Sequence, residues 1–520
     1  MNLTESLKID LLKTFESRDY LQAETKAQTL VRKGFSDPWL CNILAVIFAK
    51  QEKYSLAAKY FKILTELFPN DYESFFNLGN LYRDTKNISQ SKKYYTLSLK
   101  KNPTHFETCF ELAKIFFSER KFDQALEFAN KSIKINSNFF EGHDLIGQIL
   151  FSTGRFNESQ KKYEFLLKHS DEKVRDKILV NISSNKIELG NIKQAKEILT
   201  ACTSNMGNYN LSLMQIKEGN LNKGWENYDY GISNGVRKVR DIDFFSTKLK
   251  LWNPEENCKS ILVLGEQGIG DEIMYSSIIN ELIAKKFRVG LYMDKRLKEI
   301  FSRSFNNYEF IEKREDAINK GYETFIPIAS LCRYFRNNLN DFYKYNFHLK
   351  ANKKILQKIN AFYKSTKPRI GLAWHTESQS HGPQRNIKLS KFSHLLKNEK
   401  IDFINLQYSD HDKEIKRLSR KLKRKIFLID CIDNKNDIDG LCAKIEACDI
   451  VISIDNSTLH LAGSLNKDTI GLIPKVSDWR WMTNTDVTPW YKSIKLFRSD
   501  GNWEEVILKA KNHCIDKFRL

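Results

Sequence analysis

Small and bulky positions recur with one fixed period along the first third of the chain. One series of small residues, spaced 34 apart, is Ala45, Gly79, Ala113 and Gly147. A second small series in the same register is Ala23, Ala57, Ser91, Ala125 and Ser159. A series of bulky residues has the same spacing of 34: Tyr20, Tyr54, Ile88, Phe122 and Phe156. This period predicts repeated helix pairs, in which small residues let the two helices approach closely and bulky residues fill the grooves between pairs.

The repeated unit resembles the tetratricopeptide repeat. Its best copy is formed by Phe75, Leu78, Gly79, Tyr82 and Pro103. Five units are expected to begin near residues 4, 38, 72, 106 and 140, and two looser units follow around 191–195 and 219–225. We therefore predict an all-α solenoid over residues 1–235, whose concave face binds a peptide or protein. A passive spacer or a dimerisation arm is the alternative.

The second half of the chain alternates short apolar runs with helical periodicity. Runs rich in β-branched residues predict buried parallel strands, and helices between them indicate βαβ units. The predicted strands are 260–265, 288–292, 323–327, 369–374, 402–407, 425–429, 450–454 and 469–473. We expect an α/β region of two Rossmann-like lobes, 259–350 and 368–520, joined by a connection over 351–367 and preceded by a linker over 236–258.

The first predicted lobe opens with a glycine-rich turn after its first strand. Gly265, Gly268 and Gly270 allow a sharp turn into a helix and a close approach of a ligand to the backbone. The order of these glycines differs from that of the dinucleotide-binding fingerprint. Asp271 follows directly, either as a functional carboxylate or as a helix N-cap.

A second strand-to-helix turn lies at residues 449–463. An apolar run ends in Asp455, and Asn456, Ser457 and Thr458 precede an apolar helical segment. A helix N-terminus offers unpaired N–H groups and a partial positive charge, which suit a phosphate or diphosphate. An ordinary capped helix is the alternative.

In chain order, these turns and the motifs around them resemble the bacterial heptosyltransferase-like GT-B glycosyltransferases, of the family 9 type. The similarity is to the branch in which such a domain follows tetratricopeptide repeats. The other matching motifs lie at 219–226, 369–374, 385–389, 405–407, 477–481 and 489–491. The architecture is also related to that of the protein O-linked N-acetylglucosamine transferases.

The resemblance implies an inverting transfer of a hexosyl or heptosyl group from a nucleotide-sugar donor to a protein or glycan acceptor presented by the repeats. Asp271 matches the proposed base, which takes the proton of the acceptor hydroxyl. The residues implied in donor binding are Arg385, Lys388, Gln407, Asp455, Asn456, Ser457, Thr458 and His460. For His460 the alternative is an interior histidine with a structural role.

Residues 375–385 depart from the family pattern, which usually carries an Asn-Pro and an Asp-Arg pair here. The sequence therefore leaves the donor sugar open. The same departure is the best argument for an alternative function, a repeat scaffold whose glycosyltransferase-like domain is inactive. Asp-Ile-Asp triplets at 241–243 and 437–439 mimic the metal motif of another glycosyltransferase class, but outside its context, so we predict no metal and no cofactor.

An aromatic cluster near the C-terminus has two interpretations. Trp479, Trp481, Trp490 and Tyr491 could stack on a sugar or a base. We favour packing of the C-terminal helix onto the fold, because clustered aromatic side chains more often form core contacts.

Composition narrows the function classes. The net charge of +20 is spread along the chain, and we find no nucleic-acid-binding motif, so we predict no nucleic-acid partner. Nine cysteines without a C-x-x-C pair indicate neither a zinc site nor a disulfide framework. The first residues lack the pattern of a signal peptide, and the longest apolar run, 39–49, is too short to span a bilayer. We expect a cytoplasmic protein without a transmembrane segment.

Overall fold

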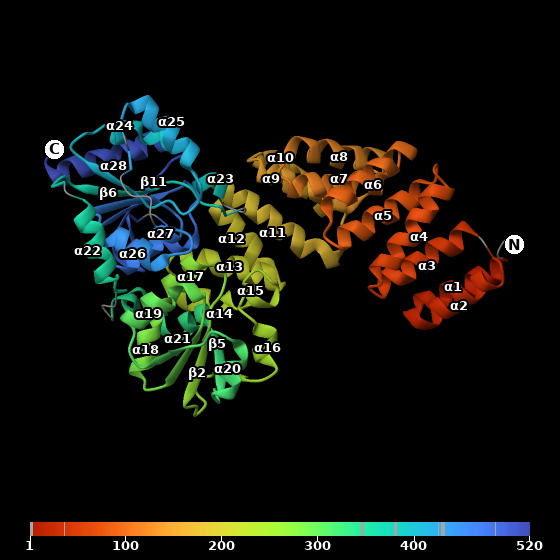
Figure 1. Ribbon diagram of the computed structural model, residues 1–520, viewed down its shortest axis with the longest axis horizontal. Helices are drawn as coiled ribbons and strands as arrows, with labels where there is room; N and C mark the ends of the chain where they lie inside the picture. The colour runs from red at the N-terminus through yellow and green to blue at the C-terminus, as the bar shows by residue number, and fades with distance from the viewer. Residues whose placement is uncertain are drawn as a thin grey trace. The chain divides into compact units, whose positions relative to one another are not determined.

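The computed structural model describes residues 4–35, 37–344, 348–363, 365–378, 382–424, 426–427, 432–483 and 485–520. The chain divides into two compact units, Met1–Ala195 (unit 1) and Lys196–Leu520 (unit 2). Figure 1 shows the elements of both units, many of them labelled, and each unit is described here by itself.

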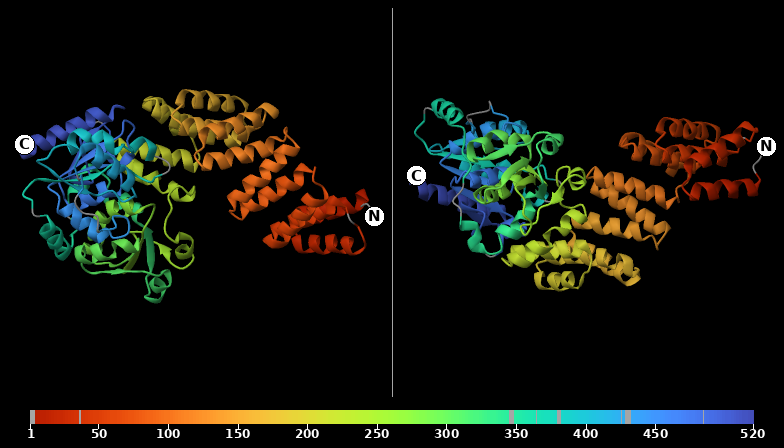
Figure 2. Two further views of the ribbon diagram at one scale, coloured as in Figure 1. Left: turned by 45° about the horizontal axis from the view of Figure 1, so that its top comes forward. Right: turned by 90° about the horizontal axis from the view of Figure 1, so that it is seen from below.

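Unit 1 is built from successive helix pairs, which follow one another in chain order in Figure 2. The first helices are α1 (Glu5–Glu16), α3 (Pro38–Lys50), α5 (Tyr72–Asp84), α7 (Phe106–Ser118) and α9 (Phe140–Ser152). Their partners are α2 (Tyr20–Arg32), α4 (Tyr54–Leu67), α6 (Ile88–Lys101), α8 (Phe122–Ile135) and α10 (Phe156–His169). Helix α11 (Glu172–Glu188) follows, and α12 (Ile192–Ala201) crosses the division between the units. The five predicted repeat units are confirmed, and each second helix begins at a residue of the bulky series.

Close packing within the pairs explains the small positions of the repeat. A Cβ atom at Gly79 would lie 2.6 Å from Cδ1 of Tyr95, and one at Gly147 would lie 2.6 Å from Cζ of Tyr163. Both tyrosines are buried on the second helix of the same pair. A side chain larger than hydrogen at either glycine would therefore push the two helices apart.

The first lobe of unit 2 is a parallel five-stranded sheet with the strand order β1-β5-β2-β3-β4. Its strands are β1 (Lys250–Leu251), β2 (Ser260–Leu264), β3 (Arg288–Tyr292), β4 (Tyr308–Phe310) and β5 (Thr324–Pro327). Its helices and 3₁₀ turns are α16 (Ile242–Ser246), α17 (Ile269–Tyr275), η1 (Ser276–Ile278), α18 (Ile279–Ala284), η2 (Lys295–Leu297), α19 (Lys298–Ser304), α20 (Arg314–Asn319), η3 (Ile328–Leu331), α21 (Cys332–Phe335) and η4 (Leu339–Tyr343). Alternation along β2 separates two cores: Ile261 and Val263 join the larger one beneath α17–α19, and Leu262 packs with Phe245 of α16.

The second lobe is a six-stranded sheet with the order β10-β11-β9-β8-β6-β7, in which β10 alone pairs antiparallel. Its strands are β6 (Arg369–Ala373), β7 (Asp402–Asn405), β8 (Ile450–Ile454), β9 (Thr469–Ile473), β10 (Val487–Thr488) and β11 (Tyr491–Arg498). Its helices and 3₁₀ turns are α22 (Lys353–Phe362), α23 (Gly382–Arg385), η5 (Leu389–Phe392), α24 (Ser393–Leu396), α25 (Asp412–Leu422), α26 (Ile438–Glu446), α27 (Ser457–Ser464), η6 (Trp479–Trp481) and α28 (Trp503–Phe518). Helices α24, α25 and α28 cover one face, and α26 and α27 cover the other (Figure 1).

The boundary between the repeats and the α/β region differs from the prediction. Helices α13 (Asn205–Lys217), α14 (Leu221–Tyr228) and α15 (Tyr230–Ser233) lie within the predicted solenoid 1–235 but belong to unit 2. Trp225 of α14 is buried in the core of the first lobe, and its Nε1 donates to the carbonyl of Arg336 at 2.8 Å. The predicted linker 236–258 also contains folded structure, because α16 and β1 pack on the first sheet.

Seven predicted strands are confirmed, as β2, β3, β5, β6, β7, β8 and β9. The sequence analysis did not predict four strands: β1, β4, β10 and β11. The predicted strand at 425–429 lies largely outside the described residues. Across the part of the chain that the structure describes, no helix is both long enough and apolar enough to cross a membrane.

Candidate functional site

Two helix N-termini, one from each lobe, meet in unit 2. Helix α17 follows β2 and has Gly268 as its N-cap, and α27 follows β8 with Asn456 as its N-cap. A Cβ atom at Gly270 would lie 3.4 Å from Cα of Ser457 and 3.2 Å from Cδ2 of His460. The predicted glycine turn and the predicted strand–turn–helix at 449–463 are therefore in direct contact, and Gly270 permits that approach.

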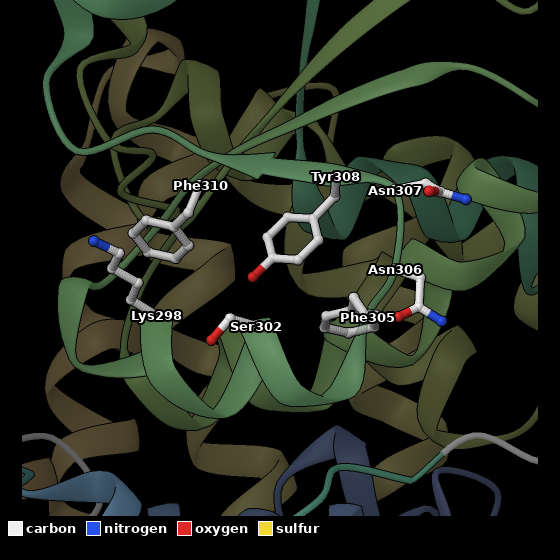
Figure 3. A pocket seen from close by; sticks show the side chains of 7 residues that line it. All are labelled: Lys298, Ser302, Phe305, Asn306, Asn307, Tyr308 and Phe310. Carbon is white, nitrogen blue, oxygen red and sulfur yellow. The ribbon is translucent and has the colours of Figure 1, made fainter.

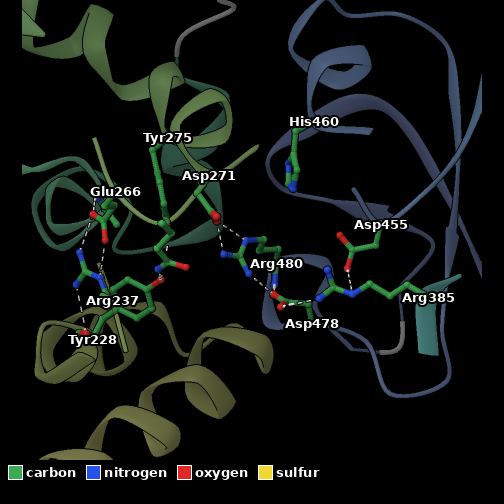
Figure 4. A network of polar contacts seen from close by, with 12 residues as sticks. Tyr228, Arg237, Glu266, Asp271, Tyr275, Arg385, Asp455, His460, Asp478 and Arg480 are labelled. Carbon is green, nitrogen blue, oxygen red and sulfur yellow. Dashed lines mark hydrogen bonds and ion pairs between the residues drawn. The ribbon is translucent and has the colours of Figure 1, made fainter. Parts of the chain in front are cut away.

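Asp271 lies in the first turn of α17 and forms an ion pair with a residue of the other lobe. Nε of Arg480 donates to Oδ1 of Asp271 at 3.0 Å, and Nη2 donates to the same oxygen (Figure 4). Asp271 is not the helix N-cap, because Gly268 takes that position. Arg480 lies within the motif 477–481, but sequence reasoning did not select it as a site residue.

The ion pair continues into the second lobe through a shared carboxylate. Nη1 of Arg480 donates to Oδ1 of Asp478 at 2.6 Å, and Nη2 of Arg385 donates to Oδ2 of Asp478 at 3.3 Å. Nε of Arg385 lies 3.1 Å from Oδ2 of Asp455. The two predicted polar residues Asp271 and Arg385 are thus linked across the lobes by Arg480 and Asp478. We call these five residues the interlobe network.

Burial and charge set the ionisation of the network. Burial opposes the charge on Arg480, but Asp271 and Asp478 raise its pKa well above the ordinary value, so its guanidinium is charged. Burial raises the pKa of Asp455, against the opposing effect of Arg385. Within the described residues, Oδ2 of Asp455 accepts no hydrogen bond, so its contact with Arg385 is an ion pair only.

His460 is held in its neutral form inside the second lobe. Its Nδ1 lies 3.0 Å from the hydroxyl of Tyr491, and its ring stacks on Trp481 with centroids 5.2 Å apart. Burial, with a further contribution from Arg480, lowers the pKa of His460 from 6.5 to about 3. These contacts are those of an interior histidine at the edge of the network.

Gln407 has a fully engaged amide group. Its Oε1 accepts from the backbone N–H groups of Trp374 and His375 at 3.1 and 2.9 Å. Its Nε2 donates to the carbonyl of His375 at 2.9 Å and to Oγ of Ser409 at 2.8 Å. The side chain therefore joins the ends of β6 and β7, and these bonds leave it little capacity to read a nucleotide.

The other predicted donor residues occupy different environments. The side chain of Asn456 caps α27 by accepting from the N–H of Leu459 at 3.2 Å, and Oγ1 of Thr458 donates to the carbonyl of Leu406 at 3.3 Å. Ser457 is partly exposed at the first position of the helix. Lys388 is exposed at the start of η5, outside the interlobe network.

Glu266 of the glycine turn holds the helical segment α13–α15 to the first lobe. Its two carboxylate oxygens accept from Nε and Nη2 of Arg237, each at 2.8 Å, and both side chains are buried. Nη1 of Arg237 also donates to Asp229 at 2.6 Å. The ion pair between Arg237 and Glu266, with its two hydrogen bonds, therefore fixes the turn that carries Asp271.

The Asp-Ile-Asp triplets have structural contacts. Asp437 caps α26 by accepting from the N–H of Gly440 at 2.8 Å. Asp439 accepts from Nη1 of Arg303 in the first lobe at 3.2 Å. In the other triplet, Asp241 accepts from the hydroxyl of Tyr292 at 2.5 Å.

The aromatic cluster packs inside unit 2, as favoured, but on different partners. Trp479 contacts Trp225 and Tyr228, each with ring centroids 5.6 Å apart. Trp490 contacts Tyr275 of α17, with centroids 5.5 Å apart. The predicted role in packing the C-terminal helix is therefore replaced by contacts with α14 and the first lobe.

A separate hollow of about 780 Å³ lies between α19 and the edge strand β4 (Figure 3). It is lined by Lys298, Ser302, Phe305, Asn306, Asn307, Tyr308 and Phe310. None of the predicted site residues lines it. The ammonium of Lys298 is already paired with Glu312 at 2.5 Å, which weakens the hollow as an anion site.

Comparison with known proteins supports the repeats. The tetratricopeptide repeat family matches residues 72–105 and 106–139, which are the third and fourth predicted units. Protein FlbA of Caulobacter vibrioides is 26% identical over 357 residues, or 61% of this chain, and the match spans 58% of FlbA. A tetratricopeptide repeat protein from Parabacteroides merdae matches at 15% identity and a TM-score of 0.36, over 47% of this chain and 96% of that chain. YrrB, described as a repeat protein with an unusual peptide-binding site, matches at 14% identity and a TM-score of 0.30, over 34% of this chain and 89% of its own. The chain therefore carries tetratricopeptide repeats in unit 1, followed by an α/β region with two mainly parallel sheets.

Proposed function

We propose that unit 2 is an inverting, metal-independent glycosyltransferase of the GT-B type, which moves a sugar from a nucleotide-sugar donor to a protein or glycan acceptor. The observation that carries the proposal is the interlobe network. It brings the candidate base Asp271 together with the cation Arg385 where α17 and α27 meet.

The second lobe supplies features that suit a diphosphate. The N-terminus of α27 lies at the carboxyl end of β8, in the region where parallel sheets commonly bind ligands. Arg385 follows β6, which is the neighbour of β8 in the sheet. A guanidinium can hold two phosphate oxygens and so disperse the negative charge that develops on a departing nucleotide.

The reaction balances with these groups. The acceptor hydroxyl oxygen attacks the anomeric carbon, while the bond from that carbon to the diphosphate oxygen breaks. The hydroxyl proton passes to the carboxylate of Asp271, and the nucleoside diphosphate leaves with the electron pair of the broken bond. Both bonds from Arg480 go to Oδ1 of Asp271, so Oδ2 lies outside that ion pair and is suited to receive the proton.

Unit 1 provides the proposed binding site for the acceptor. Its helix pairs follow one another along the chain, and stacked helix pairs commonly bind peptides or proteins. In this proposal the repeats select the acceptor, and unit 2 carries out the chemistry.

The first experiment is a thermal-shift and calorimetric screen of the full chain against UDP-, GDP- and ADP-linked sugars and the free nucleotides. A ligand that binds only the folded protein raises its melting temperature. We expect one nucleotide class to stabilise the protein selectively. If all of them fail in both measurements, the alternative function, a repeat scaffold with an inactive α/β region, replaces the proposal.

A second experiment tests Asp271 with the donor identified by the screen. The substitution Asp271→Asn should lower the rate of transfer by about a hundredfold to ten-thousandfold while donor binding is retained, because only the proton acceptor is lost. The control is Asp439→Asn, which removes a carboxylate from the other interlobe ion pair, with Arg303. Equal transfer by wild type and Asp271→Asn would remove Asp271 as the base.

A further inference from the structure

Arg480 holds the central position in the interlobe network. All three guanidinium nitrogens are engaged: Nε and Nη2 with Asp271 of the first lobe, and Nη1 with Asp478 of the second. The guanidinium also lies over the ring of Trp479, 4.5 Å from its centroid. The side chain is only 12% exposed, so its contacts are little screened by water.

The network holds more carboxylates than cations. Arg480 and Arg385 share Asp478, and each binds one further carboxylate, Asp271 or Asp455. Among the described residues of the network, two guanidinium groups therefore face three carboxylates. A diphosphate that enters beside α27 brings further negative charge, which favours the exchange of a carboxylate on a guanidinium for phosphate oxygens.

On the basis of the proposed function, we propose that Arg480 is a second diphosphate-binding residue that couples donor binding to release of the base. In this proposal, Asp271 occupies the position on Arg480 that a phosphate oxygen of the donor takes. When a nucleoside diphosphate binds, the guanidinium turns to the diphosphate and the ion pair with Asp271 breaks. Asp271 is then released from Arg480, and both of its carboxylate oxygens face the acceptor without a competing guanidinium.

The geometry favours Arg480 over other cations for this exchange. It reaches Asp271 directly, whereas Arg385 contacts Asp455 and Asp478 within its own lobe. Gly270 places the first turn of α17 against Ser457 and His460 at the start of α27. An anion at this helix terminus therefore lies next to both ends of the Arg480–Asp271 pair.

The test measures the affinity of the full chain for UDP, GDP and ADP by isothermal titration calorimetry. Asp271→Asn removes the carboxylate that competes for Arg480 and keeps the shape of the side chain. We expect this variant to bind the preferred nucleotide about threefold to tenfold more tightly than wild type. Arg480→Lys keeps one charge but loses the planar set of donors, so it should bind about tenfold to a hundredfold more weakly.

Asp439→Asn is the matched control, because it breaks an interlobe ion pair outside the network and should leave the affinity unchanged. A purely structural ion pair would instead shift the affinities of Asp271→Asn and Arg480→Lys in the same direction. Equal or weaker binding by Asp271→Asn, unchanged binding by Arg480→Lys, or tighter binding by Asp439→Asn each overturns the exchange but leaves nucleotide binding intact. If wild type binds none of the three nucleotides, the proposed function fails as well.

Discussion

At the scale of single residues, His460 shows how the core controls charge near the site. The imidazole is 5% exposed and lies close to Arg385 and Arg480, so protonation would place a third cation beside two others. Its pKa is about 3 in the folded protein and 6.5 without these surroundings. Between these values the unfolded chain binds a proton that the folded chain does not bind, so the contribution of His460 to stability is complete above pH 6.5 and declines as the pH falls.

This difference predicts a specific acid sensitivity. Below pH 6.5, protonation of the unfolded state at His460 should lower the free energy of unfolding by up to about 1.4 kcal/mol for each pH unit. Urea unfolding of wild type and His460→Asn between pH 6.5 and 4.5 measures the effect. The variant should be less stable at pH 7 but lose less stability on acidification. Equal pH dependence in the two proteins would contradict the assignment.

Individual side chains were predictable from sequence only where local structure fixes them. Asn456 acts at a helix start, and the strand-to-helix turn revealed it. For the other turn, the sequence offered Asp271 as the helix cap, a position that Gly268 takes. Arg480 was missed because a long side chain between two tryptophans gives no sign of the carboxylate that it reaches. Gln407 was assigned to the nucleotide because it ends a strand, yet its amide is taken up by backbone groups that only the fold brings near.

At the scale of elements, the third and fifth repeat units balance a glycine on the first helix against a tyrosine on the second. Where the first helix has Gly79 or Gly147, the second has Tyr95 or Tyr163 opposite it. At the corresponding positions of the fourth unit, 34 residues from Gly79 and Tyr95, the chain has Ala113 and Ala129. The second unit has Ala45 and Phe61 there, so the 34-residue period fixes where the paired helices meet and not the identity of either residue.

This balance predicts coupling between the two positions. Gly79→Ala should destabilise unit 1 by about 1–3 kcal/mol, because the new Cβ meets the Tyr95 ring. The double variant Gly79→Ala/Tyr95→Ala reproduces the alanine pair of the fourth unit. Chemical unfolding should show that it costs less than the sum of the single variants, by about 1 kcal/mol. Additive losses would show that the two positions do not share one packing space.

Strands, like single side chains, were predicted where their own sequence pattern identifies them and missed where it does not. Runs such as 260–264 and 450–454 are mostly apolar and are buried throughout, which is typical of central parallel strands, and they were predicted. Strand β11 begins at Tyr491 and mixes buried with exposed residues, so Tyr491 was assigned to helix packing and the strand was missed. Strand β4 has only three residues, too few for a periodic pattern.

At the scale of the whole molecule, the two units have different kinds of core. Unit 1 has a row of local contacts between neighbouring helix pairs, as repeat proteins do. In unit 2 the largest core extends through both lobes and includes Tyr209, Trp225 and Tyr228 of the helical segment. We therefore expect the units to unfold in separate steps.

Differential scanning calorimetry of the full chain tests this expectation. Two transitions should be resolved, and a nucleotide that binds unit 2 should raise the temperature of only one of them. Gly79→Ala should lower the temperature of the other. A single transition that both changes shift together would contradict separate unfolding.

Because α13–α15 belong to unit 2, a repeat array cannot be exchanged at the point where the repeat-like pattern ends. A chimaera joined at residue 235 would remove Trp225 from the core of the first lobe. It would also remove Asp229, the partner of Arg237. The transplantable module begins instead within α12, near Lys196. Exchange of repeat arrays between such proteins, by recombination or by design, should therefore yield folded products when the crossover lies on the N-terminal side of that residue.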